Sequence, residues 1–268
     1  MKQLFVRLFN FYIQASIHVA LAAVSLLYVF VVSMSQQIDN SLFLTVFFGT
    51  ITGYNFVKYA SIAKLYHSSL TNALKVIQAF SLVSFVLMCF YILQLPIVTL
   101  LVFGAIGLLT MLYAIPFVAS KNIRSITGLK IYVVAICWAI TTVLLPLVYY
   151  NLTFEKEVLV KFFQIIALVI ALIIPFDIRD LEYDNKQLNT IPQQFGIKKA
   201  KGLSVLLFLC ICALELIIFK GIQSYVLMLI CVLSTIVIVL MPLRAPKYYC
   251  SFLVESMPIL YGLLILIC

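Results

Sequence analysis

Runs of about 20 mostly apolar residues recur along the whole chain, and a helix of that length crosses the hydrocarbon core of a bilayer. Of the 268 residues, 65% are hydrophobic and only 10% are charged. Soluble domains carry about 25% charged residues. We therefore expect an all-α, polytopic membrane protein with about nine transmembrane helices. The expected spans are residues 11–34, 41–60, 72–94, 96–117, 129–150, 158–178, 200–219, 222–241 and 249–268.

The expected spans follow one another through short connections, without a long linker or a low-complexity tract. We therefore expect residues 1–268 to form a single transmembrane domain. Lys and Arg accumulate on the cytoplasmic side of membrane proteins. With the N-terminus inside, 15 of the 18 Lys and Arg residues lie on the inner side, and only Lys156, Lys161 and Lys220 lie outside. The sequence thus predicts a cytoplasmic N-terminus, an external C-terminus and a bacterial cytoplasmic membrane. Membrane topology, rather than nucleic-acid binding, explains the net charge of +9.

Four of the nine acidic residues lie within the eight positions 177–184, at the end of the sixth span. If that helix continues for a turn or two, Asp177, Asp180 and Asp184 fall within an arc of about 60° on one face. Carboxylates that close repel one another unless a cation lies among them. Mg²⁺ takes hard oxygen ligands and is often held by one or two carboxylates together with substrate phosphates. The pattern favours a metal–diphosphate site over the simpler alternative, a solvated loop whose acids balance nearby lysines.

The acidic segment reads DIRDLEYD (177–184) and is followed by NTIP (189–192) and FG (195–196). It resembles the second aspartate-rich motif of the UbiA superfamily of intramembrane prenyltransferases, and the nine expected spans extend this resemblance to essentially the whole chain. The resemblance implies transfer of a prenyl group from a prenyl diphosphate to an unidentified lipophilic acceptor within the membrane lipid. It also implies Mg²⁺ as the cofactor, with Asp177, Asp180 and Asp184 as metal ligands and Asp180 and Asp184 as catalytic residues.

The first motif of that family, NDxxDxxxD at the end of the second span, is degenerate in this chain. Asn55 is kept, but Phe56, Tyr59 and Ala63 stand at the three acidic positions, and residues 41–154 contain no Asp or Glu. Lys58 lies within the lost cluster, and a lysine can hold phosphate as a point charge without metal. One hypothesis is that Asn55 and Lys58 contact the substrate while the second motif holds a single Mg²⁺. The alternative is a catalytically inactive protein that binds an isoprenoid or quinone, or acts as a scaffold.

Further substrate contacts are implied by the resemblance alone. In the family, a tyrosine and a basic residue near the third inner loop approach the diphosphate, so Tyr113, Lys121 and Arg124 are the matching positions. Ordinary positive-inside charge explains the two basic residues equally well. Glu255 lies within the last expected span, where an ionisable group is a functional candidate by default. A structural pairing of Glu255 with a neighbouring cation is the alternative interpretation.

Overall fold

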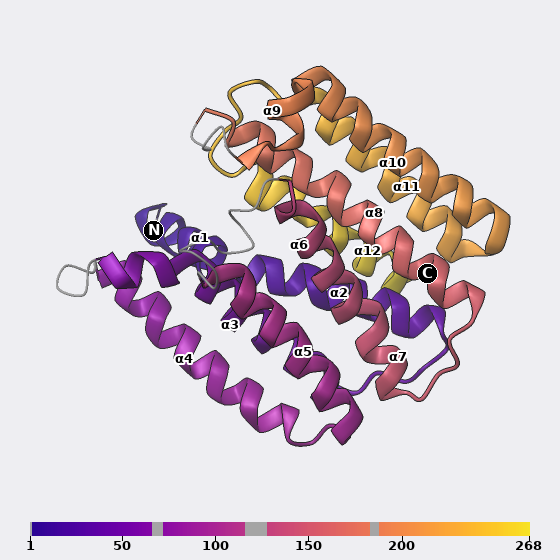
Figure 1. Cartoon of the computed structure of the whole chain (residues 1–268), viewed down its shortest axis with the longest axis horizontal. Helices are drawn as coiled ribbons and strands as arrows, with labels where there is room; N and C mark the ends of the chain where they lie inside the picture. Colours follow the sequence, from indigo (N-terminus) through magenta and orange to yellow (C-terminus); the bar gives the residue numbers. More distant parts are fainter. Residues whose placement is uncertain (1, 66–71, 116–127, 183–187) are drawn as a thin grey trace.

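The computed structural model of the chain describes residues 2–65, 72–115, 128–182 and 188–268. Within these ranges all regular structure is helical (Figure 1). The helices are α1 (Lys2–Gln14), α2 (Ile17–Ser33), α3 (Asn40–Leu65), α4 (Asn72–Ile92), α5 (Ile97–Ala114), α6 (Lys130–Ala139), α7 (Leu145–Tyr149), α8 (Lys156–Arg179), α9 (Ile191–Phe195), α10 (Ile197–Ile218), α11 (Ile222–Leu240) and α12 (Ser256–Ile267). Two segments are π-helical: η2 (Ile140–Leu144) joins α6 to α7, and η4 (Tyr249–Val254) precedes α12.

Seven helical segments of the described chain are long and apolar enough to cross a membrane, and the bent pair of α1 and α2 makes an eighth. α3 covers the expected span 41–60 but is not among these eight. At 26 residues it exceeds the roughly 20 that a span requires, but Tyr54, Asn55 and Lys58 make it more polar. Every expected span thus coincides with a helix, and the expected all-α integral membrane protein is confirmed.

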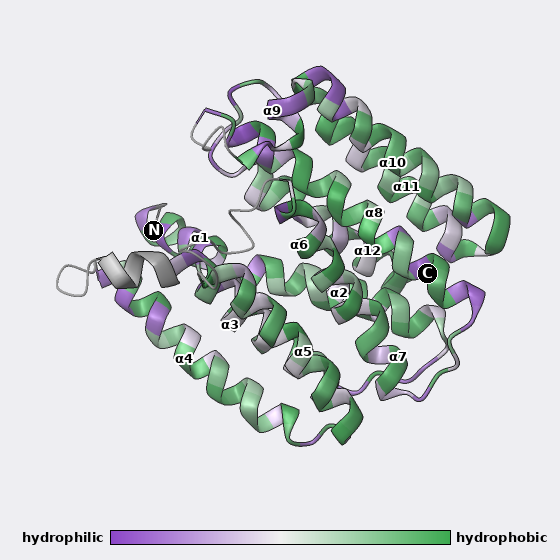
Figure 2. Ribbon diagram, in the orientation of Figure 1, coloured by the Kyte–Doolittle hydropathy of each residue, from purple (hydrophilic) through white to green (hydrophobic). Residues whose placement is uncertain are grey.

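Apolar side chains cover the outside of the helical bundle as well as its inside. Leu93, Ile217 and Leu240 are 79%, 77% and 71% exposed, as expected of side chains that face lipid. In Figure 2 the helices are hydrophobic along most of their length, whereas hydrophilic residues gather on α1, around α9 and at the start of α10. We call the end of the bundle where α8 finishes and α9 begins the α9 end.

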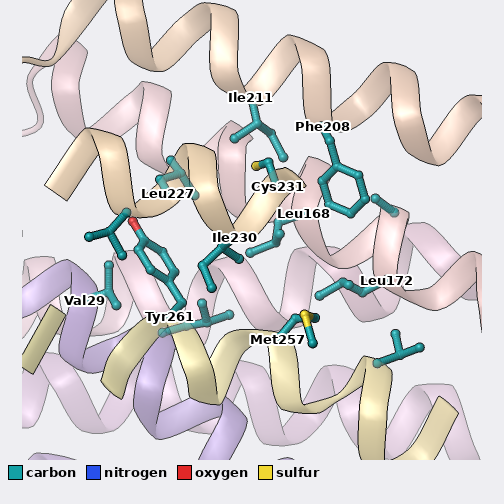
Figure 3. Packing of buried hydrophobic residues seen from close by; sticks show 14 of the residues in the cluster. Val29, Leu168, Leu172, Phe208, Ile211, Leu227, Ile230, Cys231, Met257 and Tyr261 are labelled. Carbon is teal, nitrogen blue, oxygen red and sulfur yellow. The ribbon is translucent and has the colours of Figure 1, made fainter. Parts of the chain in front are cut away.

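A shared core joins α2, α8, α10, α11 and α12. Figure 3 shows how side chains from these helices interlock. The labelled members are Val29, Leu168, Leu172, Phe208, Ile211, Leu227, Ile230, Cys231, Met257 and Tyr261. α12 approaches α2 closely at Gly262, where an added Cβ would lie 2.8 Å from the Cβ of Ser25. Small residues of this kind allow the backbones of membrane helices to pack tightly.

Candidate functional site at the α9 end

A sharp bend between α1 and α2 brings the first polar residues of the site together. The two helices meet at 54°, and Ser16 at the bend has a left-handed backbone with φ 62°. Asn55 of α3 accepts a hydrogen bond from Ser16 Oγ at 2.8 Å, and its Nδ2 donates to Ala15 O at 3.1 Å and to Ser81 Oγ at 2.8 Å. Lys58 Nζ donates to the same Ser16 Oγ at 2.8 Å. The Asn55 side chain is only 3% exposed, and its amide bonds to Ala15, Ser16 and Ser81. It therefore links α3 to α4 and to the junction between α1 and α2.

Three ionisable side chains from distant parts of the sequence lie close enough to interact electrostatically beside this bend. Glu255 follows η4 directly, and its side chain is half-buried. The cations that interact electrostatically with Glu255 are Lys58 from α3 and Arg179 from the end of α8. Tyr12 and Tyr54 also lie close enough to interact with the Glu255 carboxylate. α1, α3, α8 and the η4–α12 segment therefore each contribute side chains to one polar region.

The acidic segment takes a different local shape from the expected one. α8 ends at Arg179, and Asp180 is its C-terminal cap, so the helix does not continue through Asp184. The Arg179 guanidinium donates two hydrogen bonds to the Asp180 carboxylate, from Nε to Oδ1 at 2.7 Å and from Nη2 to Oδ2 at 2.9 Å. The expected continuation of this helix by a turn or two beyond residue 178, on which the shared face of three aspartates depended, is therefore wrong. Asp184 itself lies outside the described residues.

Asp177 lies one turn earlier on α8 and is almost fully buried, with 2% of its surface exposed. Lys130, at the start of α6, forms an ion pair with it, with Nζ to Oδ1 at 3.0 Å. The pair borders a cavity of about 290 Å³ at the α9 end. The other lining residues come from positions 128–132, 188–191, 194 and 195. The Asp177 side chain thus links α8 to α6 through Lys130 and also lines the cavity.

Three predicted site residues remain, and of these only Tyr113 lies within the described residues. Tyr113 is buried near the C-terminal end of α5, with 8% of its surface exposed. It interacts electrostatically with Tyr54, so it lies near the polar region around Glu255. Lys121 and Arg124 lie outside the described residues.

The acids of the second motif have the donor chemistry that a divalent cation requires. Asp180 is 34% exposed and can be reached from outside, and carboxylate oxygens are hard ligands. Each of the two described aspartates, Asp177 and Asp180, is already paired with a cation, and no group of three or more His, Cys, Asp or Glu residues occurs within the described ranges. These residues therefore fit a metal ion provided that the ion replaces a side-chain cation.

Sequence reasoning missed the two partners of the acidic motif, Lys130 and Arg179. A lysine at the start of one span and an acid at the end of the next helix both lie at the same end of a bundle, so the Lys130–Asp177 pair could have been anticipated. The Arg179–Asp180 pair could not, because adjacent residues on a continuing helix do not face each other. Trp138, the single tryptophan, was also missed, and its Nε1 donates to Tyr54 OH at 2.8 Å.

No family model matches the sequence, and no curated protein matches it. Solved structures match almost the full length of the chain. A UbiA homologue from Aeropyrum pernix K1, in its apo form, has a TM-score of 0.65 at 14% identity, covering 94% of this chain and 99% of its own. A UbiA homologue from Archaeoglobus fulgidus, solved with bound Cd²⁺, has a TM-score of 0.58 at 13% identity, covering 96% and 100%. A digeranylgeranylglyceryl phosphate synthase has a TM-score of 0.57 at 17% identity, covering 96% and 98%. The resemblance drawn from the acidic motif is thus confirmed at the level of the fold: the protein has a UbiA-type helical fold.

Proposed function

We propose that the protein is an intramembrane prenyltransferase that transfers a prenyl group from a prenyl diphosphate to a lipophilic acceptor. The observation that carries the proposal is the convergence of Lys58, Arg179 and Glu255 beside the acidic motif in a UbiA-type fold. The similarity to a digeranylgeranylglyceryl phosphate synthase, whose product is a prenylated lipid, supports the same class of reaction.

In the proposed reaction, Asp180 and Asp184 would hold Mg²⁺, whose positive charge would offset the negative charge of the diphosphate leaving group. Lys58 supplies a cation from α3, where the first acidic motif is missing. Cleavage of the allylic C–O bond releases diphosphate and leaves a carbocation for the acceptor to attack. Aromatic ring faces stabilise such a cation, and Tyr12 and Tyr54 are the rings near Glu255 that can do so.

The remaining proposed site residues have supporting roles. Asp177, the third acid proposed as a metal ligand, is held next to the cavity by Lys130. Tyr113 from α5, a proposed substrate contact, interacts electrostatically with Tyr54, and Lys121 and Arg124 follow it in the sequence. Asn55 acts on the substrate indirectly, because its amide fixes the bend against which Lys58 is positioned.

We also propose that the α9 end faces the cytoplasm of a bacterial cell, with the N-terminus inside and the C-terminus outside. The distribution of Lys and Arg supports this orientation, because 15 of the 18 lie on the side of the N-terminus. A water-soluble diphosphate head group would then reach the site from the cytoplasm, while its prenyl chain and the acceptor remain among the apolar helices.

A second candidate function is a non-catalytic protein that binds an isoprenoid or quinone-like lipid, or that supports a partner enzyme. Two observations favour it. The first acidic motif is absent, and both described aspartates of the second motif are already paired with a cation. This candidate predicts lipid binding that is indifferent to Mg²⁺.

Binding of a non-hydrolysable geranylgeranyl diphosphate analogue to the detergent-purified protein separates the two candidates. We expect binding that requires Mg²⁺ and that weakens at least about tenfold, or 1.4 kcal/mol, in Asp180→Asn/Asp184→Asn. The matched control is Glu182→Gln, which removes an exposed acid from the same segment and should bind as the wild type does. Binding that is absent, or that ignores both the metal and the double substitution, would contradict the prenyltransferase proposal.

A further inference from the structure

The ion pair between Arg179 and Asp180 forms where α8 ends. On a continuing helix, residues that are adjacent in sequence point in different directions and do not meet. Here the helix stops at Arg179, so the Asp180 side chain is free to turn towards the guanidinium. The result is a two-point contact at 2.7 and 2.9 Å that occupies both oxygens of the carboxylate. The Asp180 carboxylate, a proposed metal ligand, is thus paired with the side chain of the preceding residue, Arg179.

The buried pair between Lys161 and Glu215 shows what a permanent ion pair looks like in this protein. The side chain of Glu215 is 1% exposed, and it accepts hydrogen bonds from Lys161, Gln164 and Ser224. The Arg179 and Asp180 side chains are instead 30% and 34% exposed. Ion pairs that solvent reaches contribute little to stability and can exchange partners. Of these two pairs, the Arg179–Asp180 pair is therefore the one that can open without disturbing the core.

Arg179 also faces the region in which a substrate head group is proposed to lie. Its guanidinium stands 5.1 Å from the centre of the Phe176 ring and interacts electrostatically with Glu255. Glu255 in turn interacts with Lys58 on the other side of the site. A planar guanidinium is well suited to bind phosphate oxygens at two points.

We propose that Arg179 is an exchangeable counter-ion. It neutralises Asp180 when the site is empty, and it moves to the phosphate groups of the ligand when a divalent cation takes its place on Asp180. The inference rests on the proposed function and goes beyond it by assigning a role to Arg179. The Asp180 carboxylate then has a positive partner in both states.

The exchange makes opposite predictions for the metal alone and for the metal with diphosphate. Without diphosphate, Arg179 competes with the metal for Asp180. With diphosphate present, Arg179 has another partner, so the competition ends and each ligand strengthens binding of the other. Such coupling is reciprocal, so it can be measured from either ligand.

The test is Mn²⁺ binding to the detergent-purified full chain, followed by electron paramagnetic resonance, with and without inorganic diphosphate. In Arg179→Gln we expect Mn²⁺ alone to bind about tenfold more tightly than in the wild type, because a charge-assisted competitor has been removed. The increase in Mn²⁺ affinity that diphosphate produces should fall in the same variant. Arg179→Lys, which keeps the charge but loses the two-point contact, should give intermediate values.

Lys199→Gln is the matched control, because it removes one exposed positive charge from the same end of the bundle. Equal Mn²⁺ affinities in Arg179→Gln and Lys199→Gln would overturn the proposal, since general electrostatics would then explain any change. Absence of Mn²⁺ binding in Arg179→Gln would overturn it as well. An affinity gain that Asp180→Asn abolishes supports the exchange, even if the geranylgeranyl analogue fails to bind and the prenyltransferase proposal falls.

Discussion

At the scale of the residue, the least replaceable polar contact lies far from the proposed site. Glu215 is buried between α8, α10 and α11, and Lys161 donates to both of its oxygens at 3.0 and 2.8 Å. Lys161 also stands 4.0 Å from the centre of the Phe219 ring. Glu215 itself is only 1% exposed. Its partner lies 54 positions away, a pairing that periodicity does not reveal.

Removing one member of this pair leaves an uncompensated charge in a low-dielectric interior. We expect Glu215→Ala to lower the free energy of unfolding by about 3–5 kcal/mol. The double variant Lys161→Met/Glu215→Leu should recover most of that loss, because it removes both charges and keeps the volume filled. Thermal unfolding in detergent, followed by circular dichroism, measures both. A single variant as stable as the wild type would show that the pair is not desolvated.

At the scale of the element, the helices themselves were predictable and their interruptions were not. Runs of apolar residues located every span, because span length follows from bilayer thickness. The bend at Ser16 falls inside an apolar run without Pro or Gly, and Asn55 of α3 stabilises it from a distance. The end of α8 at Arg179 likewise separates Asp180 from the face expected for it. Both interruptions depend on contacts between elements or on local pairing, so a helical period drawn through them gave the wrong neighbours.

The contact between α2 and α12 depends on the absence of a side chain at Gly262. A Cβ there would lie 2.8 Å from the Cβ and 3.2 Å from the Cα of Ser25, so the two helices would have to separate. We expect Gly262→Ala to destabilise the protein by about 1–3 kcal/mol, as overpacking does. Gly202→Ala in α10 is the control, because an added Cβ meets nothing within 4 Å and favours the helix. Equal melting temperatures for the two variants would contradict the close approach of α2 and α12.

At the scale of the whole molecule, the charge distribution predicts one orientation in the membrane. Gln194 in α9 and Thr153 before α8 are exposed residues, and the predicted topology places them on opposite sides. We expect a membrane-impermeant maleimide added to intact cells to label Thr153→Cys but not Gln194→Cys. Serine at the exposed Cys210 and Cys268 removes background labelling. Labelling of Gln194→Cys from outside would invert the topology and place the proposed site away from the cytoplasm.

The arrangement of the site followed from the sequence only in part. The acidic segment correctly marked the end of the sixth expected span, which is the end of α8. The UbiA-type fold inferred from that segment is confirmed. The convergence of Lys58, Arg179 and Glu255 required the three-dimensional arrangement of α3, α8 and η4, because nearly 200 residues separate the first from the last. Lys58 was singled out because it lies within the lost acidic cluster, and the structure adds the carboxylate with which it interacts, that of Glu255.

The central claim is that a prenyl diphosphate binds where these three side chains meet. The most direct measurement is photo-crosslinking in lipid nanodiscs with an analogue that carries a diazirine on the isoprene unit next to the diphosphate, with the labelled peptides identified by mass spectrometry. The account predicts labels on α3 around Lys58, on the end of α8 and on η4, all lost when unlabelled prenyl diphosphate competes. Labels confined to the lipid-facing sides of α4, α5 or α10, and unaffected by competition, would contradict it.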